Sequence, residues 1–383
     1  MTRSLRNRAA IAGIGQTEFS KESGRSELQL ACEAIKAALD DAGLAPREVD
    51  GLATFTMDSS EEAEVGRNLG IERLSMFSRV PYGGGAACGV VMQAAMAIAT
   101  GVADVVVCYR AFNERSGFRY GGSGMGQAML PPWLDWYGPY GLLSPAAWVA
   151  LHARRYMHAY GVTNADFGRI SVVDRKHAAT NPAAWFYQRP ITLEDHQASR
   201  WIVEPVLRLL DCCQESDGGV ALVVTSMDRA RDLPHAPVRV AAASQGHLRD
   251  GDEMFGYYRG DLSGYEEGAF LGEQLYEATG LAPDDIDVAM IYENFTPIVF
   301  IQLEAFGFCG PGEATDFIAG GNIEVGGKLP VNPNGGLLGE AYIHGMNNIL
   351  EGVRQVRGTA ANQVEGAEHV LVSAGRSGLV LSP

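Results

Sequence analysis

The sequence predicts an α/β fold assembled from two copies of one structural unit. The segment GLAPREVD at 43–50 returns as GLAPDDID at 280–287. In both places the segment follows an amphipathic helical pattern and precedes an apolar strand pattern, in the same register. The two copies lie too far apart in the chain for a solenoid repeat. A doubled unit packs its halves about a pseudo-twofold axis, so a site at their junction would draw residues from both halves.

The N-terminal copy begins with a continuously apolar strand at 9–15, a pattern typical of a strand buried on both faces. A helix over 26–42 should follow, because Ser26 can cap its start and Gly43 can end it. The remaining elements are a strand at 51–56, a glycine-rich turn leading into a small-residue helix at 80–101, and a strand at 103–111. Strands that alternate with helices predict a mainly parallel sheet.

The C-terminal copy repeats this order of elements. We expect a helix over 266–279, a strand at 288–293, a second glycine turn that opens a helix within 332–358, and strands at 369–375 and 378–382. The shared order extends the repeat from one octapeptide to the whole half.

Between the copies lies a segment with no repeat partner over most of its length. It is rich in aromatic residues, and a helix over 144–161 is expected because Ser144 can cap it and Pro145 suits its first turn. Large irregular insertions in α/β folds usually shape a substrate pocket. The predicted domains are therefore an N-terminal half at 1–111, a loop domain with the remaining N-half elements at 112–265, and a C-terminal half at 266–383.

The chain of 383 residues carries a net charge of −16 and has a pI near 4.9. A surface this acidic repels phosphate backbones, so no nucleic-acid partner is expected. The six cysteines form no CxxC pair, which favours reduced thiols over a disulfide framework or a zinc site. The basic N-terminus lacks the apolar core of a signal peptide, and the apolar runs fall short of a membrane span. We therefore expect a soluble, cytoplasmic protein.

Four loops carry distinctive motifs: PYGGGAAC at 81–88, YENF at 292–295, GGLLGEAYIHG at 335–345 and SAG at 373–375. They resemble the catalytic loops of the thiolase superfamily, most closely those of the sterol-carrier and lipid-transfer-protein thiolases. Family members carry a nucleophilic cysteine in a glycine turn before a helix that ends GVAD, and here that position is Gly84. Where the family has a loop with a pattern like HDCF, this chain has YENF, and where the family has GGLxxxGHPxG, this chain has GGLLGEAYIHG. Tyr292 and Tyr342 therefore stand at the positions of two family histidines. The second cysteine position, in a CxG pattern, is Ser373.

This resemblance covers nearly the whole chain and implies the thiolase fold, a duplicated five-layered α/β/α/β/α arrangement with pseudo-twofold halves and an inserted loop domain. Without a nucleophile, an acyl-enzyme is not expected. The pattern is similar to that of thiolase-like retro-aldolases, which cleave steroid β-hydroxyacyl-CoA substrates bearing a tertiary hydroxyl. It implies a 17-ketosteroid and propionyl-CoA as products, in sterol side-chain degradation. A thiolase-type acyltransferase and an inactive lipid-binding protein are the alternatives.

Retro-aldol cleavage needs removal of the β-hydroxyl proton and stabilisation of a thioester enolate, and a phenol can serve both needs. We therefore interpret Tyr292 and Tyr342 as the catalytic pair. The competing interpretation is two core tyrosines whose hydroxyls bond to backbone. The candidates for the oxyanion and substrate-binding site are Asn294, Gly84, Gly375 and His344. For His344 a purely structural role is equally open.

Other mechanisms find less support in the residues. Cys88 lies one helical turn beyond the missing nucleophile, which favours a buried core cysteine over a displaced nucleophile. Lys328 could in principle form a Schiff base, but its polar surroundings indicate a surface turn. The histidines are scattered, so no metal site is expected.

By resemblance the protein forms a homodimer and holds no permanent cofactor, because its substrate is itself a coenzyme A thioester. Family members work with an OB-fold partner domain that bears a zinc ribbon and is often part of an enoyl-CoA hydratase. No cysteine cluster in this chain could form that ribbon, so any zinc would belong to the partner.

Overall fold

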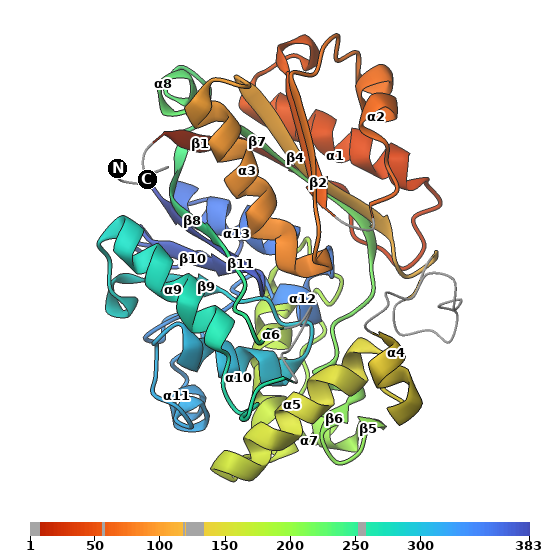
Figure 1. Ribbon diagram of the computed structural model, residues 1–383, viewed down its shortest axis with the longest axis vertical. Coiled ribbons are helices and arrows are strands. Elements are labelled where there is room, and N and C mark those ends of the chain that lie inside the picture. Colours follow the sequence, from red (N-terminus) through yellow and green to blue (C-terminus); the bar gives the residue numbers. More distant parts are fainter. Residues whose placement is uncertain (1–7, 56–57, 118, 120–133, 252–257) are drawn as a thin grey trace.

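A computed structural model describes residues 8–55, 58–117, 119, 134–251 and 258–383. Its centre is a nine-stranded mixed sheet in the order β3-β2-β4-β7-β1-β8-β11-β10-β9 (Figure 1). These strands are β1 Ala9–Gln16, β2 Gly51–Phe55, β3 Met76–Val80, β4 Val105–Asn113, β7 Asp217–Ser226, β8 Val238–Gln245, β9 Val288–Met290, β10 Val370–Ser373 and β11 Ser377–Ser382.

The sheet order confirms the duplication. Read outward from its middle, one side runs β1-β7-β4-β2 and the other runs β8-β11-β10-β9. The pairing directions of these eight strands match as well, because β2–β4 and β9–β10 are parallel while the other pairs within each set of four are antiparallel. Strand β3 adds one further parallel neighbour beyond β2. Strands β1 and β8 pair antiparallel across the middle and join the two halves. The pseudo-twofold axis predicted from the repeat therefore passes between these two strands.

Helices divide the molecule into the five predicted layers (Figure 1). Helix α1 (Glu27–Ala42) covers the outer face of β1, β4 and β7. Helices α3 (Ala87–Thr100) and α13 (Met346–Arg357) lie between the half-sheets and contact strands of both. Helices α9 (Glu266–Thr279) and α10 (Thr296–Ala305) cover the far side of the second half.

The two copies of the repeated segment fold alike. Helix α1 is capped by the Ser26 side chain, and both α1 and α9 end at a glycine in the left-handed region, with φ of 68° at Gly43 and 77° at Gly280. Glycine adopts this conformation without the cost that a side chain would add. Each GLAP sequence then forms a short 3-10 turn, at Pro46–Glu48 and at Pro283–Asp285, before its strand begins. The predicted helices over 26–42 and 266–279 are confirmed.

The prediction of a mainly parallel sheet was wrong. Only β2–β3, β2–β4 and β9–β10 pair in parallel. The reason is β7, which lies between β4 and β1 and runs antiparallel to both. This strand and β8 fall inside 112–265, so strands of the central sheet come from the segment read mainly as a loop domain.

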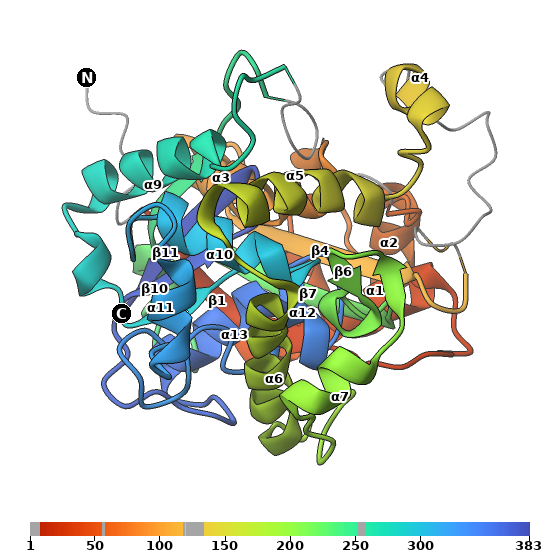
Figure 2. The same cartoon turned by 90° about the horizontal axis from the view of Figure 1, so that it is seen from below.

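The described residues from 134 to 208 lie together at one end of the molecule (Figure 1). Helix α5 (Pro145–Tyr160) has the expected Ser144 cap and lies across α10 (Figure 2). Helix α6 (Asn164–Thr180) packs beside α12 (Gly336–Gly339), which belongs to the second glycine turn. The smaller described elements are α2 Glu62–Leu69, α4 Leu134–Tyr137, β5 Trp201–Val203, β6 Leu207–Arg208, α7 Leu193–Ala198, α8 Met227–Ala230 and α11 Ala314–Ala319.

One stretch, Gly83–Thr100, is long and apolar enough to cross a membrane by length and composition. The expectation that no apolar run reaches such a length was therefore wrong. This stretch contains α3, the middle-layer helix, and 56% of it is buried inside the protein. Its packing between the two half-sheets accounts for much of this composition, because a helix with a wide buried face is apolar over that face.

Candidate active site

Tyr292 lies in the loop that follows β9, two residues beyond the end of that strand. The strand was predicted to continue to residue 293 but ends at Met290. The Asn332 side chain explains the difference, because its amide accepts from the Ile291 N–H at 2.8 Å and donates to the Ile291 carbonyl at 3.0 Å. A side chain thus takes the place of a neighbouring strand, and the backbone is free to turn toward the site.

Tyr342 lies in an extended segment between α12 and α13, outside both helices of the second glycine turn. It forms an isolated parallel bridge with Glu215, and its N–H donates to the Ser216 hydroxyl at 3.2 Å. The segment before β7 also holds the other loop, because the Cys213 N–H donates to the carbonyl of Asn294 at 2.9 Å. One short stretch of chain therefore sets the spacing of both tyrosine loops.

The two tyrosine hydroxyls lie 2.6 Å apart and share a hydrogen bond. Their rings meet edge to face, with centroids 6.2 Å apart, and both side chains are buried, at 7% and 8% exposed. Leu337 and Cys213 pack against the pair. Burial raises the pKa of Tyr342 well above its usual value of 10, and the neighbouring Tyr292, Cys213 and Glu114 raise it further. The structure thus brings together the two predicted residues, and their catalytic role stays a prediction.

Gly84 lies in the short 3-10 turn Gly83–Ala86 that opens α3, directly against Tyr292. A methyl group placed on Gly84 would lie 2.6 Å from Cζ of Tyr292 and closer still to its hydroxyl oxygen. The Tyr292 hydroxyl therefore occupies the space that a side chain at position 84 would need. Gly345 also lies against this ring, because a methyl group placed on it would come within 3.0 Å of Cδ2 of Tyr292.

Ser373 and Gly375, at the end of β10, support the Tyr292 loop. The Ser373 hydroxyl accepts from the Tyr292 N–H at 3.3 Å and donates to the Gln302 side chain at 2.5 Å, and that side chain donates to the Tyr292 carbonyl at 2.8 Å. Gly375 has φ of 69°, and its carbonyl accepts from the Tyr265 hydroxyl. The serine at the second cysteine position is thus bonded to backbone and amide groups.

His344 lies beside Tyr342, with ring centroids 4.7 Å apart. His344 has φ of 50° and lies before α13, which begins only at Met346. Arg110, completely buried, places Nε 3.4 Å from His344 Nδ1. Because arginine can only donate, Nδ1 is an acceptor and the ring carries its proton on Nε2. Burial and the Arg110 charge lower the pKa of His344 well below 6.5, so the ring is neutral.

Asn294 and Glu293 follow Tyr292 in the same loop and are both buried. Asn294 is tied through its backbone carbonyl, as described above. A Glu293 carboxylate oxygen accepts from the Leu337 N–H and thereby joins this loop to the second glycine turn. Burial raises the pKa of Glu293 to about 8, and the buried Asp174, whose own pKa is raised well above 3.8, lies close enough to interact with it. Glu293 therefore has a structural hydrogen bond.

Cys88 points away from the tyrosines into the middle layer. It is completely buried, and its sulfur lies 3.6 Å from the Val372 carbonyl oxygen in β10. Burial raises the pKa of its thiol far above the usual range, so the thiolate needed for nucleophilic attack is unavailable. Lys328 is 59% exposed and pairs with Asp284 at 3.2 Å, as a surface residue would.

Several residues at the site escaped the sequence analysis. Arg110 lies inside β4, Glu114 follows that strand in a turn, and Cys213 and Ser216 lie just before β7. Polar residues at the end of an otherwise buried strand were the available signal, because such residues rarely enter a core without a partner.

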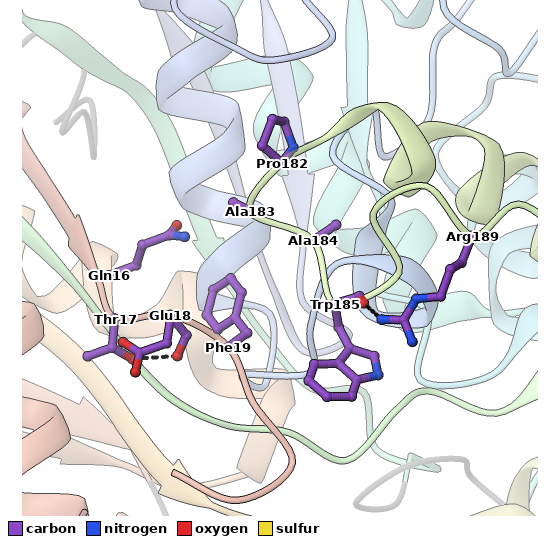
Figure 3. A pocket seen from close by; sticks show the side chains of 9 residues that line it. All are labelled: Gln16, Thr17, Glu18, Phe19, Pro182, Ala183, Ala184, Trp185 and Arg189. Carbon is purple, nitrogen blue, oxygen red and sulfur yellow. Dashed lines mark hydrogen bonds between the residues drawn. The ribbon is translucent and has the colours of Figure 1, made fainter.

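A cavity of about 420 Å³ lies elsewhere, and neither tyrosine lines it (Figure 3). Its walls are the segment 16–19 and the segment 182–185, with Arg189 at the rim. Trp185 connects it to the Tyr342 loop, because the backbone N–H of Trp185 donates to the backbone carbonyl of Glu340 at 2.9 Å. Within the described residues, no three His, Cys, Asp or Glu side chains are grouped to hold a metal ion.

The chain is similar to a known family model and to two named enzymes. The family model for the thiolase C-terminal domain matches residues 259–382. A steroid side-chain-cleaving aldolase of Thermomonospora curvata is 64% identical over 97% of this chain and 97% of its own length. The 17-hydroxy-3-oxo-4-pregnene-20-carboxyl-CoA lyase of Mycobacterium tuberculosis is 60% identical, over 98% of this chain and all of its own length.

The fold is also similar to that of a solved structure. It is described as an Ltp2-ChsH2(DUF35) aldolase, and it superposes with a TM-score of 0.94 at 63% sequence identity. The match covers 99% of this chain and 98% of that one. The thiolase fold expected from the four loops is therefore confirmed.

Proposed function

Because the chain belongs to the steroid side-chain-cleaving aldolase branch of the thiolase superfamily, we propose that it cleaves a 17-hydroxy steroid whose side chain is a coenzyme A thioester. The reaction is a retro-aldol cleavage that yields a 17-ketosteroid and propionyl-CoA. The relative from Mycobacterium tuberculosis is named for a substrate with this arrangement, a 17-hydroxyl and a 20-carboxyl-CoA group.

The proposed reaction moves one proton and breaks one carbon–carbon bond. A base removes the proton from the 17-hydroxyl, and the oxygen forms a carbonyl as the bond from C17 to C20 breaks. The electron pair of that bond becomes the enolate of the thioester. A proton then adds to C20 and gives propionyl-CoA, so no oxidant, reductant or water is consumed.

The hydrogen-bonded pair of Tyr292 and Tyr342 carries this proposal. Two phenols in contact can pass a proton from one oxygen to the other, and each can donate to a developing oxyanion. In the proposed mechanism one tyrosine takes the hydroxyl proton and the other serves the enolate. The pair lies in a buried setting where such interactions are stronger than in water.

Thiolase-type acyl transfer is the second candidate, and the geometry disfavours it. An acyl-enzyme needs an activated nucleophile in the glycine turn. Gly84 has none, and the Tyr292 hydroxyl fills the space in which one would stand. Cys88 faces the core, and Ser373 is engaged with Gln302 and the Tyr292 backbone.

We propose that the thioester oxygen is held by groups around the tyrosine pair. The N–H groups of the turn at Gly84, the Asn294 side chain and the neutral His344 ring are the donors at hand, and Gly375 allows the chain to approach closely. Substrate binding to these groups would place the developing enolate beside the phenols. None of these donors carries a full charge at neutral pH, which suits an oxyanion that exists only transiently.

We further propose a homodimer that works in the cytoplasm with a DUF35-type partner of the OB-fold and zinc-ribbon class, linked to an enoyl-CoA hydratase. The solved aldolase named above includes ChsH2(DUF35) in its description. No permanently bound cofactor is proposed, since the chemistry requires only acid–base groups. Co-expression with such a partner should give a complex that survives gel filtration, whereas full turnover by the isolated chain would remove the need for one.

The function is tested by supplying the thioester of a 17-hydroxy steroid in the absence of free coenzyme A. Retro-aldol cleavage should release 17-ketosteroid and propionyl-CoA in equal amounts, because it needs no second substrate. A thiolase would release nothing until free coenzyme A is added. Strict dependence on added coenzyme A would therefore overturn the proposal and favour acyl transfer.

A further inference from the structure

Two adjacent asparagines at the start of α13 contact both of the loops that carry the tyrosines. Asn347 and Asn348 follow Met346, the first residue of that helix, and both side chains are completely buried. Consecutive side chains on a helix point in different directions. The dipeptide can therefore reach two separate loops from one rigid element.

Asn347 holds the loop of Tyr342. Its Nδ2 donates to the Ala341 carbonyl at 3.0 Å, and Ala341 directly precedes the tyrosine. The same Nδ2 donates to the buried Glu340 carboxylate at 2.9 Å. Two more amide groups donate to that carboxylate, from Asn181 at 3.0 Å and Asn334 at 2.6 Å. The backbone just before Tyr342 is thus bonded to the helix both directly and through a fixed carboxylate.

Asn348 holds the loop of Tyr292 in the corresponding way. Its Nδ2 donates to the Ile291 carbonyl at 3.2 Å, and Ile291 directly precedes the tyrosine. That carbonyl also accepts from Asn332 at 3.0 Å. In each loop the helix therefore bonds to the residue immediately before the tyrosine.

Stability alone does not account for asparagine at these two positions. The Oδ1 atoms of Asn347 and Asn348 are buried and have no hydrogen-bond partner among the described residues. An unpaired buried acceptor costs free energy, which a leucine of similar size would not. The bonds that these side chains donate to the two loops offset that cost and give the amide groups a purpose.

Resting on the proposed retro-aldol function, we propose that Asn347 and Asn348 are positioning residues that set the distance between the two tyrosine hydroxyls. Hydrogen bonds between hydroxyl groups span only about 2.5–3.0 Å. The tyrosine oxygens lie 2.6 Å apart, so a small shift of either loop is enough to part them. By fixing both loops to one helix, the two asparagines keep the pair within reach for proton transfer.

The test compares Asn347→Leu and Asn348→Leu with Asn322→Leu. Asn322 is the matched control, since its amide donates to the Phe317 carbonyl at 2.9 Å, outside both tyrosine loops. Asn347→Leu removes two hydrogen bonds and should lower kcat by roughly 10²-fold, the typical effect of misplacing a reacting group by about 1 Å, with little change in KM. Asn348→Leu should lower kcat less, because its acceptor keeps a second donor. Asn322→Leu should keep the parent kcat.

A double variant separates positioning of the pair from general damage to the fold. When Tyr342→Phe has already broken the hydroxyl pair, adding Asn347→Leu should lower kcat little further, because both changes act on the same interaction. Losses of kcat that simply multiply would overturn the inference, as would a parent-like kcat in both Asn347→Leu and Asn348→Leu.

A measurement without substrate distinguishes this inference from the proposed function. In urea unfolding, the coupling between Tyr292→Phe and Tyr342→Phe reports the bond between the two hydroxyls. This coupling should be present in the parent and lost in the Asn347→Leu background. Asn347→Ala, a smaller change, serves the same purpose if the leucine variant does not fold. Unchanged coupling in the Asn347 variants would overturn the inference, whereas absence of cleavage by the parent protein would overturn the proposed function.

Discussion

Gly84→Ala is the smallest change that tests whether Tyr292 has taken the place of a nucleophile. The added methyl group would lie 2.6 Å from Cζ and 2.7 Å from Cε2 of Tyr292, far inside van der Waals contact. The ring also lies close to Gly345, where an added methyl group would come within 3.0 Å of its Cδ2 atom. Tyr292 must therefore move, and the 2.6 Å bond between the two hydroxyls cannot survive unchanged.

The expected magnitudes follow from this displacement. Forcing an extra methyl group into a filled site typically costs about 1–3 kcal/mol of stability. Displacing a proton-transfer group should lower kcat by roughly 10²–10⁴-fold, much more than it changes substrate binding. The double variant Gly84→Ala with Tyr292→Ala should show little additional loss of stability from the glycine change, because the clashing ring is gone.

The assay combines urea unfolding with steady-state cleavage of the steroid thioester. Gly66→Ala in α2 is the control, since its methyl group would meet nothing closer than 3.8 Å and should be neutral or slightly stabilising. If Gly84→Ala unfolds and turns over like the parent, the Tyr292 hydroxyl does not lie where the structure places it. Equal destabilisation by Gly84→Ala in the presence and absence of Tyr292 would refute the same reasoning.

Three further predictions concern the residues around the pair. Cys88→Ala, and alkylation of accessible thiols, should leave turnover within a few-fold of the parent, because Cys88 faces the core; an acyl group trapped on Cys88 would contradict this. Ser373→Ala should lower the free energy of unfolding in urea by about 1–3 kcal/mol, because it removes the hydroxyl that accepts from the buried Tyr292 N–H. An unchanged unfolding midpoint would show that this hydrogen bond does not stabilise the fold. The pKa of Glu293 is raised from 4.5 to about 8, so folding favours the protonated form of its carboxyl. As pH rises across that range, the free energy of unfolding of the parent should therefore fall relative to that of Glu293→Gln. Parallel pH profiles of the two free energies would exclude this.

The duplicated fold could be predicted from the sequence because local patterns determine most of it. The capped helices at 26–42 and 266–279 and the two GLAP turns depend on neighbouring residues, and all appear as expected. The direction of the strands could not be predicted in the same way. It depends on β7, which pairs between β4 and β1 from a distant part of the chain.

The same distinction holds at the site. Alignment of loop motifs was enough to pair Tyr292 with Tyr342, because both halves of a duplicated fold bring equivalent loops to one junction. The early end of β9 was not visible in the sequence, because it results from the Asn332 amide replacing a strand partner. Nor could the sequence show that Arg110 would hold His344 as a neutral ring, since those residues meet only in the folded chain.

The most direct test of the central claim is the rate of carbon–carbon cleavage by Tyr292→Phe and Tyr342→Phe. Each change removes one hydroxyl oxygen of the 2.6 Å pair and keeps the ring, so both variants should fold and bind the thioester. If the pair carries the proton transfers, single-turnover formation of propionyl-CoA should slow by roughly 10²–10⁴-fold in each variant. Near-parent rates in both folded variants would mean that the tyrosines are core residues and that the proposed mechanism is wrong.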